Sequence, residues 1–251
     1  MAKLDSKHNT VFFHMGPGFH SRIEAHQFSE RHPHVLFLDQ PTGMTFPQLV
    51  DWACQSIREQ SQISGKPLRL LGHSFGGQII AAALPQIGHL VSEVRLLNSA
   101  YDTFDCFGNI HQVLAPQNSQ ALSFWKTQSP EAKLNLIFEV AQHPQFNNVY
   151  WMNEAAQEGY TKIASLYSPL NIEAFVHVFS GVLQTPPLAG ITPWSGKAEI
   201  YYSLTDNLIR SFDVVAPWQE VFRDGKLIEI PNIGHHGLFE SPRLAEAFFR
   251  D

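Results

Sequence analysis

The chain has 251 residues, 44% of them hydrophobic, and a formal net charge of −6. This length and composition allow a large buried core and exclude an intrinsically disordered protein. The acidic balance and the absence of a basic stripe argue against nucleic acid as a partner, and two cysteines, Cys54 and Cys106, are too few for a disulfide framework.

Membrane insertion and metal binding have little support in the sequence. The polar beginning MAKLDSKHNT is unlike a signal peptide, and the longest apolar runs are far shorter than a membrane span. We therefore expect a cytoplasmic protein without a membrane span. Among thirteen histidines, His26, His32 and His34 lie close together but lack carboxylates or cysteines at metal-ligand spacing. We predict that these three are surface residues and that the chain holds no metal. Its oligomeric state is left open.

Short apolar runs alternate with longer helical stretches along most of the chain. The predicted strands are 10–15, 34–39, 67–72, 93–99, 198–204 and 226–231. The predicted helices outside the middle of the chain are 46–60, 77–84 (ended by Pro85), about 213–222, and 241–250. Near-continuous apolar strands joined by helices are typical of a parallel sheet covered on both faces, and hence of an α/β fold.

This alternation stops in the middle of the chain. From about residue 102 to about residue 190 no strong strand pattern is present, and the helical segments 130–142, 153–167 and 171–183 follow one another. No Gly/Ser-rich or strongly charged hinge marks a linker. We predict an α/β core formed by residues 1–101 and 191–251, with residues 102–190 inserted as a helical cap or lid beside the active face.

The sequence GHSFG at residues 72–76 matches the Gly-x-Ser-x-Gly pattern of a nucleophile elbow. An apolar strand precedes it and a small-residue helix follows, which is the context that the motif requires. A nucleophile on so tight a turn adopts a strained backbone, and side chains two positions away would collide with the turn. This pattern predicts Ser74 as a catalytic nucleophile, whereas we expect His73 only to pack.

A serine hydroxyl is a weak nucleophile and needs a base with a carboxylate behind it. Asp206 follows the predicted strand 198–204, and His235 follows the last predicted strand, which gives the order Ser, Asp, His. Asp102, after strand 93–99, is the alternative acid, although it is also typical of a turn that opens the insertion. His236 is the alternative base. We favour His235 because it comes first after the strand.

Stabilisation of a developing oxyanion requires two preorganised N–H donors. Phe75, the residue after the nucleophile, is expected to provide one of them. The second is expected from the glycine-containing loop after the first strand, His14–Gly18, where Gly16 is our preferred donor and Met15 the alternative.

In this arrangement the chain resembles the α/β-hydrolase superfamily, specifically its single-domain serine hydrolases with a helical cap. The resemblance extends from VFFHMGPGF through FLDQPTG, LLGHSFGG and SLTDNLI to IPNIGHHGLFESPRLAEAF. It implies a compact, mostly parallel sheet of about six strands flanked by helices, with the nucleophile strand central. The chain departs from the family where His14 is followed by Met15 instead of glycine, and where Asp39 leads into QPTGMTF. The resemblance implies a structural role for Asp39.

A serine at the elbow argues against the dehalogenases and epoxide hydrolases of that superfamily, which carry aspartate there. We expect a serine hydrolase that cleaves a small ester or thioester through an acyl-enzyme on Ser74 and uses no cofactor. A carbon–carbon bond hydrolase, an amidase, a lyase or cofactor-free oxygenase, and a ligand-binding protein on a hydrolase scaffold remain alternatives.

The predicted cap is rich in aromatic residues, which favours a small-molecule acyl substrate with an apolar part, although packing between cap helices is the alternative for each of them. These residues are Phe124, Trp125, Phe138, Tyr150, Trp151, Tyr160, Phe175 and Phe179.

Overall fold

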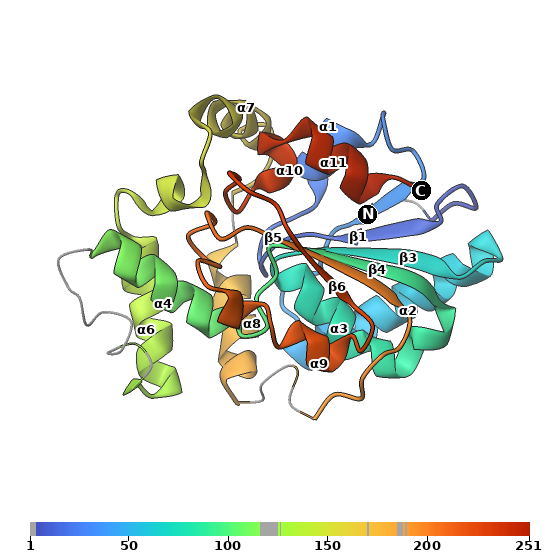
Figure 1. Cartoon of the computed structure of the whole chain (residues 1–251), viewed down its shortest axis with the longest axis horizontal. Helices are drawn as coiled ribbons and strands as arrows, with labels where there is room; N and C mark the ends of the chain where they lie inside the picture. Colours follow the sequence, from blue (N-terminus) through green and yellow to red (C-terminus); the bar gives the residue numbers. More distant parts are fainter. Residues whose placement is uncertain (1–3, 116–124, 126, 170, 185–187, 189) are drawn as a thin grey trace.

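The computed structural model describes residues 4–115, 125, 127–169, 171–184, 188 and 190–251. Its centre is a six-stranded sheet in the order β2-β1-β3-β4-β5-β6, with every pair parallel (Figure 1). The strands are β1 (Thr10–Phe13), β2 (Val35–Leu38), β3 (Leu68–His73), β4 (Val91–Leu97), β5 (Lys197–Tyr202) and β6 (Lys226–Glu229). The predicted α/β class, the six parallel strands and the central position of the elbow strand β3 are confirmed.

Alternate side chains of each strand enter the two hydrophobic cores on opposite faces of the sheet. On β1, Val11 and Phe13 lie in one core and Phe12 lies in the other, as the two-residue period of a strand requires. Helices cover both faces (Figure 1). One face is covered by α1 (Arg22–Phe28) and α11 (Pro242–Phe249), and the other by α2 (Phe46–Ser64), α3 (Phe75–Ile87) and α9 (Trp218–Val221).

Two of the predicted helices are wrong in their bounds, and proline explains both. Pro85 does not end α3, which continues to Ile87. It lies in the last turn, where its missing N–H costs only one helical hydrogen bond while Ile87 is buried in the core. The predicted helix at 213–222 is instead a 3₁₀ turn, η3 (Phe212–Val214), followed by α9. Pro217, which cannot donate a backbone hydrogen bond, stands between them.

The chain between β4 and β5 is helical wherever the structure describes it. It contains α4 (Thr103–Leu114), α6 (Pro130–Ala141), the 3₁₀ turn η2 (Phe146–Tyr150), α7 (Glu154–Ala164) and α8 (Ile172–Gln184). Helix α6 contacts both α4 and α8, whereas α7 contacts α1 and α10 (Gly237–Glu240) on the other side of the molecule (Figure 1). That these residues form a separate cap with bounds at 102 and 190 stays a prediction.

Among the described residues, no helix is both long enough and apolar enough to cross a membrane. Nor do three or more potential metal-ligating side chains gather anywhere in that part of the chain. The prediction that His26, His32 and His34 are surface residues is wrong for His32. Its side chain is buried, with its ring 5.0 Å from that of Phe249 on α11.

Candidate active site

Ser74 occupies the turn between β3 and α3 and has backbone angles of φ 53° and ψ −121°. A positive φ is unfavourable for serine and persists only where the surroundings fix it. Here the Ser74 N–H donates to the Leu97 carbonyl at 2.9 Å, and the Ser74 carbonyl accepts from Gly77 N at 3.0 Å and Ser99 Oγ at 2.7 Å. The end of β4 and the start of α3 therefore hold the elbow on both sides.

The glycines around Ser74 allow a close backbone approach. A Cβ atom on Gly76 would collide with the Phe13 carbonyl oxygen and lie 2.9 Å from that of His14, both at the end of β1. A Cβ on Gly72 would lie 2.8 Å from the amide nitrogen of Gly77. The expectation that Gly72 and Gly76 clear space for the turn is confirmed.

His235 Nδ1 lies 2.7 Å from Asp206 Oδ2, and both side chains are buried. Asp206 Oδ1 accepts from Leu208 N at 2.8 Å, so each carboxylate oxygen has a donor. Because an ionised carboxylate only accepts, the neutral His235 ring carries its proton on Nδ1, and Nε2 is left as an acceptor. Asp102, the alternative acid, is exposed.

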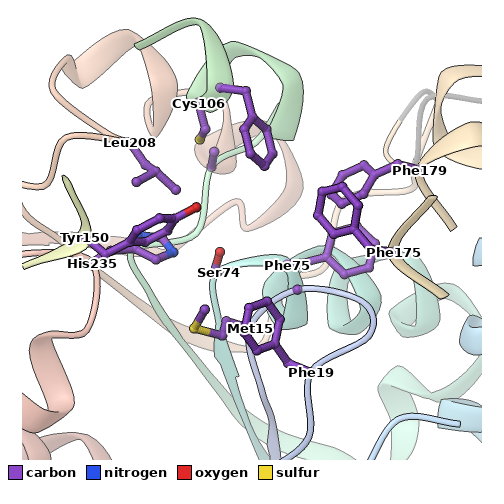
Figure 2. A pocket seen from close by; sticks show the side chains of 13 residues that line it. Met15, Phe19, Ser74, Phe75, Cys106, Tyr150, Phe175, Phe179, Leu208 and His235 are labelled. Atoms are coloured by element: carbon purple, nitrogen blue, oxygen red, sulfur yellow. The ribbon is translucent and has the colours of Figure 1, made fainter. Parts of the chain in front are cut away.

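Ser74, His235, Gly16 and Phe75 line one pocket (Figure 2), which we call the elbow pocket. The structure thus brings four of the five predicted site residues to one cavity, and the fifth, Asp206, lies behind His235. The space between the walls, mouth included, is about 500 Å³. The other lining residues are Met15, Phe19, Ala100, Cys106, Phe107, Tyr150, Phe175, Phe179 and Leu208.

The aromatic residues predicted for the cap do not all serve this pocket. Only Tyr150, Phe175 and Phe179 line it, and Trp125 is fully buried in the core. Phe124 lies outside the described residues.

The loop after β1 places Gly16 in the wall of the elbow pocket. The Met15 carbonyl accepts a hydrogen bond from His14 Nδ1 at 2.7 Å, while His14 Nε2 accepts from Gln40 N at 3.3 Å. Burial lowers the pKa of His14 to about 4, so this ring is neutral near pH 7. In a trans peptide the N–H points opposite to the carbonyl, so the Gly16 N–H points away from His14. Within the part of the chain that the structure describes, neither Gly16 N nor Phe75 N donates a hydrogen bond.

Solved structures similar to the whole chain share this architecture. A proline iminopeptidase-related protein from Thermus thermophilus superposes with a TM-score of 0.67 at 17% identity, covering 99% of this chain and 90% of that one. A malate-bound thermophilic esterase from Thermogutta terrifontis gives 0.65 at 15% identity, covering 96% and 88%. An α/β-hydrolase enzyme from a Medee basin deep-sea metagenome library gives 0.62 at 16% identity, covering 100% and 92%. The chain has the α/β-hydrolase fold. No protein-family model and no curated protein sequence matches it.

Within this α/β-hydrolase fold, three contacts that the sequence did not reveal position the backbone around His235. His73 Nε2 donates to the His235 carbonyl at 2.8 Å, and Asn98 Nδ2 donates to the Gly234 carbonyl at 2.9 Å. The Tyr150 carbonyl accepts from His235 N at 2.8 Å. His73 therefore does more than pack. Burial, followed by the nearby His235, lowers its pKa to about 3, so it stays neutral.

A further contact joins the helical insertion to the histidine loop of this α/β-hydrolase fold. Glu240 Oε1 accepts from Met152 N at 2.6 Å and Asn153 N at 3.2 Å, and Oε2 accepts from Gly234 N at 2.5 Å. One carboxylate thus satisfies three amides from two segments far apart in sequence. Of the residues that sequence reasoning missed, only Asn98 carried a signal, as a polar residue at the end of an apolar strand run.

Asp39, to which the family resemblance gave a structural role, holds the start of α1. Its carboxylate accepts from Ser21 N at 2.8 Å, Ser21 Oγ at 2.9 Å and Arg22 Nε at 3.1 Å. Partial burial raises the pKa of this carboxyl group, but the Ser21 and Arg22 hydrogen bonds outweigh burial and lower it overall. Asp39 is therefore ionised, and it anchors the loop that carries Gly16.

Proposed function

We propose that the chain is a serine hydrolase that cleaves a small ester or thioester through an acyl-enzyme on Ser74. The observation that carries this proposal is the 2.7 Å hydrogen bond between His235 Nδ1 and Asp206 Oδ2, behind a pocket that His235 lines together with Ser74. Two further observations support it. Ser74 has the strained backbone conformation of an elbow, and the N–H groups of Gly16 and Phe75 donate no hydrogen bond among the described residues.

In the proposed reaction, Ser74 Oγ attacks the substrate carbonyl carbon while His235 Nε2 takes the hydroxyl proton. Asp206 stabilises the charged imidazolium, and the Gly16 and Phe75 amides donate to the oxyanion. The bond from the carbonyl carbon to the leaving oxygen or sulfur then breaks, and His235 returns its proton to that atom. Water, deprotonated by the same base, attacks the acyl-enzyme and releases a carboxylic acid and free Ser74.

The pocket walls favour an apolar acyl group. Among the described residues that line the elbow pocket, none is Asp, Glu, Lys or Arg, and the aromatic rings of Phe75, Phe107, Phe175 and Phe179 form much of the surface. A charged acyl chain would lose its hydration there without gaining an ion pair.

The test is turnover of short p-nitrophenyl esters and matched thioesters by the purified protein, with Ser74→Ala as the control. We expect turnover and covalent labelling of Ser74 by a fluorophosphonate in the wild type, and loss of both in the variant. Equal turnover by Ser74→Ala, or an unlabelled wild type, would show the proposal to be wrong. A parallel panel of amides and carbon–carbon bond substrates, with product analysis, separates the remaining reaction classes.

A further inference from the structure

A second pocket adjoins the elbow pocket on the side of His235. We call it the His236 pocket; the space between its walls, mouth included, is about 670 Å³. It shares Met15, Phe19 and Tyr150 with the elbow pocket. Its other lining residues are Phe146, Asn147, Trp151, Gln157, Tyr160, Thr161, Ala164 and His236. Most of them come from η2, α7 and the residue after η2, so the helical insertion forms most of this wall.

His236 gives this pocket a nearly buried aromatic ring. Its side chain is only 4% exposed, and its Nδ1 is sealed inside the protein without a hydrogen-bond partner among the described residues. The ring stacks on Trp151 at 4.4 Å and lies 4.7 Å from the Tyr160 ring. Burial, with His73 and His235 close by, lowers the pKa of His236 well below its usual value. The ring is therefore neutral, and it brings no charge to the pocket wall.

The other walls are apolar, mostly aromatic, or carry neutral polar groups. Among the described lining residues, none is Asp, Glu, Lys or Arg, and the polar side chains besides His236 are hydroxyls and the amides of Asn147 and Gln157. A phosphate or a carboxylate would find no opposite charge there, and a quaternary ammonium would find aromatic ring faces but no carboxylate. A flat, uncharged ring fits because it can stack on the aromatic side chains and still hydrogen-bond.

The position of the His236 pocket relative to the base says which part of a substrate it would hold. The leaving atom receives its proton from His235, so the leaving group lies on the His235 side of Ser74. Figure 2 shows Tyr150 and His235 on one side of Ser74, and Phe175 and Phe179 on the other. Tyr150 is a wall of both pockets.

We propose that the His236 pocket is a leaving-group subsite for an uncharged aromatic alcohol or thiol, and that the acyl group lies against Phe175 and Phe179. This inference rests on the proposed hydrolase function. It narrows the substrate class to neutral esters or thioesters that are apolar on the acyl side and aromatic on the other.

The test holds the acyl group constant and compares benzyl, methyl and choline butyrate. We expect the wild type to favour the benzyl ester in kcat/KM by about tenfold or more over the other two. Ala164→Phe fills the His236 pocket from α7 and should remove this preference, measured as the ratio of kcat/KM for benzyl butyrate to that for methyl butyrate. Thr161→Phe, at an exposed position of the same wall, gives the same result if Ala164→Phe does not fold. The matched control is Ala155→Phe, on α7 but outside the lining, which should keep the preference.

Equal rates on the three esters in the wild type, or a benzyl preference that survives both filling substitutions, would overturn the subsite. A binding measurement separates this failure from failure of the proposed function. We expect titration calorimetry to detect binding of benzyl alcohol to the Ser74→Ala protein. The affinity should fall when Thr161→Phe is added. If benzyl alcohol binds and Thr161→Phe abolishes the binding, while the fluorophosphonate leaves Ser74 of the wild type unlabelled, the subsite proposal stands and the hydrolase proposal fails. No binding, with Ser74 labelled, would keep the hydrolase and reject the pocket.

Discussion

The loops at the carboxyl ends of the strands and helix α7, which belongs to the insertion between β4 and β5, are built differently. Asp206 and His235 are buried, and the Ser74 backbone is held by Leu97, Gly77 and Ser99. In contrast, none of the residues of α7 is buried. The loop of His235 and the residues just before α7 are joined by hydrogen bonds to the Glu240 carboxylate and the Tyr150 carbonyl.

This difference assigns catalysis and substrate preference to different parts of the molecule. The strand ends fix groups that must keep their positions to within a fraction of an ångström for catalysis, and they obtain that precision from the sheet. Helix α7 contributes pocket walls at which a substitution alters which substrate fits, and it packs too lightly to set the positions of the reacting groups by itself. Substitutions at the strand ends should therefore lower turnover, and those on α7 should change substrate preference.

The largest expected effect is that of Asp206→Asn. An asparagine can present N–H to His235 Nδ1, which would place the ring proton on Nε2 and remove the base. We expect kcat/KM for p-nitrophenyl butyrate to fall by about 10⁴-fold. The matched control is Asp102→Asn, at the exposed alternative acid, for which kcat/KM should stay within about twofold. A larger loss for Asp102→Asn would give the role of the acid to that residue.

Glu24→Gln tests how well α7 keeps water from α1. Burial raises the pKa of Glu24 from 4.5 to about 8. Between these values the folded chain keeps a proton that the unfolded chain releases, so wild-type stability falls as pH rises. The free energy of unfolding of Glu24→Gln minus that of the wild type should therefore increase with pH, by at most about 1.4 kcal/mol per pH unit.

Urea unfolding of both proteins at several pH values between 4.5 and 8 measures this difference. For Glu158→Gln, at an exposed position on α7, the difference in free energy of unfolding from the wild type should not change with pH. A flat profile for Glu24→Gln as well would mean that water reaches α1 beneath α7.

Replacing one glycine in each region by alanine compares how tightly the elbow and α7 are packed. Gly76→Ala places a Cβ against the backbone carbonyls at the end of β1, which cannot move aside. We expect the free energy of unfolding to fall by about 3 kcal/mol. Gly159 lies within α7 with nothing inside 4 Å of an added Cβ, so Gly159→Ala should raise it by about 0.5–1 kcal/mol. Similar losses at both sites, measured by urea unfolding, would remove the contrast.

Glu240→Gln should have the smallest effect on turnover of the strand-end substitutions. A glutamine keeps one acceptor oxygen, so it cannot serve Met152 N, Asn153 N and Gly234 N together. Because the lost contact positions the loop of His235, we expect kcat to fall by about tenfold and KM to change little. Glu246→Gln, which neutralises an exposed carboxylate beside Arg31 and His32, should leave both unchanged. A rise in KM alone would assign Glu240 to the pocket walls instead.

The predictable part of the fold and site came from local pattern. Apolar runs bounded by Pro67 and Gly72 identify β3 because a buried strand must be apolar on both faces. GHSFGG identifies the elbow because only glycine tolerates the close approach of β1 and α3. The bounds near Pro85 and Pro217 could not be predicted, since the burial of neighbouring side chains decides whether a proline ends a helix or is accommodated.

By itself, the sequence determined the sheet, its crossovers, and the placing of Ser74, Asp206 and His235 after three strands. Those features depend on hydrophobic period and turn chemistry within a few residues. Only the tertiary structure decided that His73, Asn98 and Glu240 hold the loop of His235, and that His236 faces a second pocket. Each of those contacts joins side chains to backbone groups distant in sequence, and no local pattern records such a pairing.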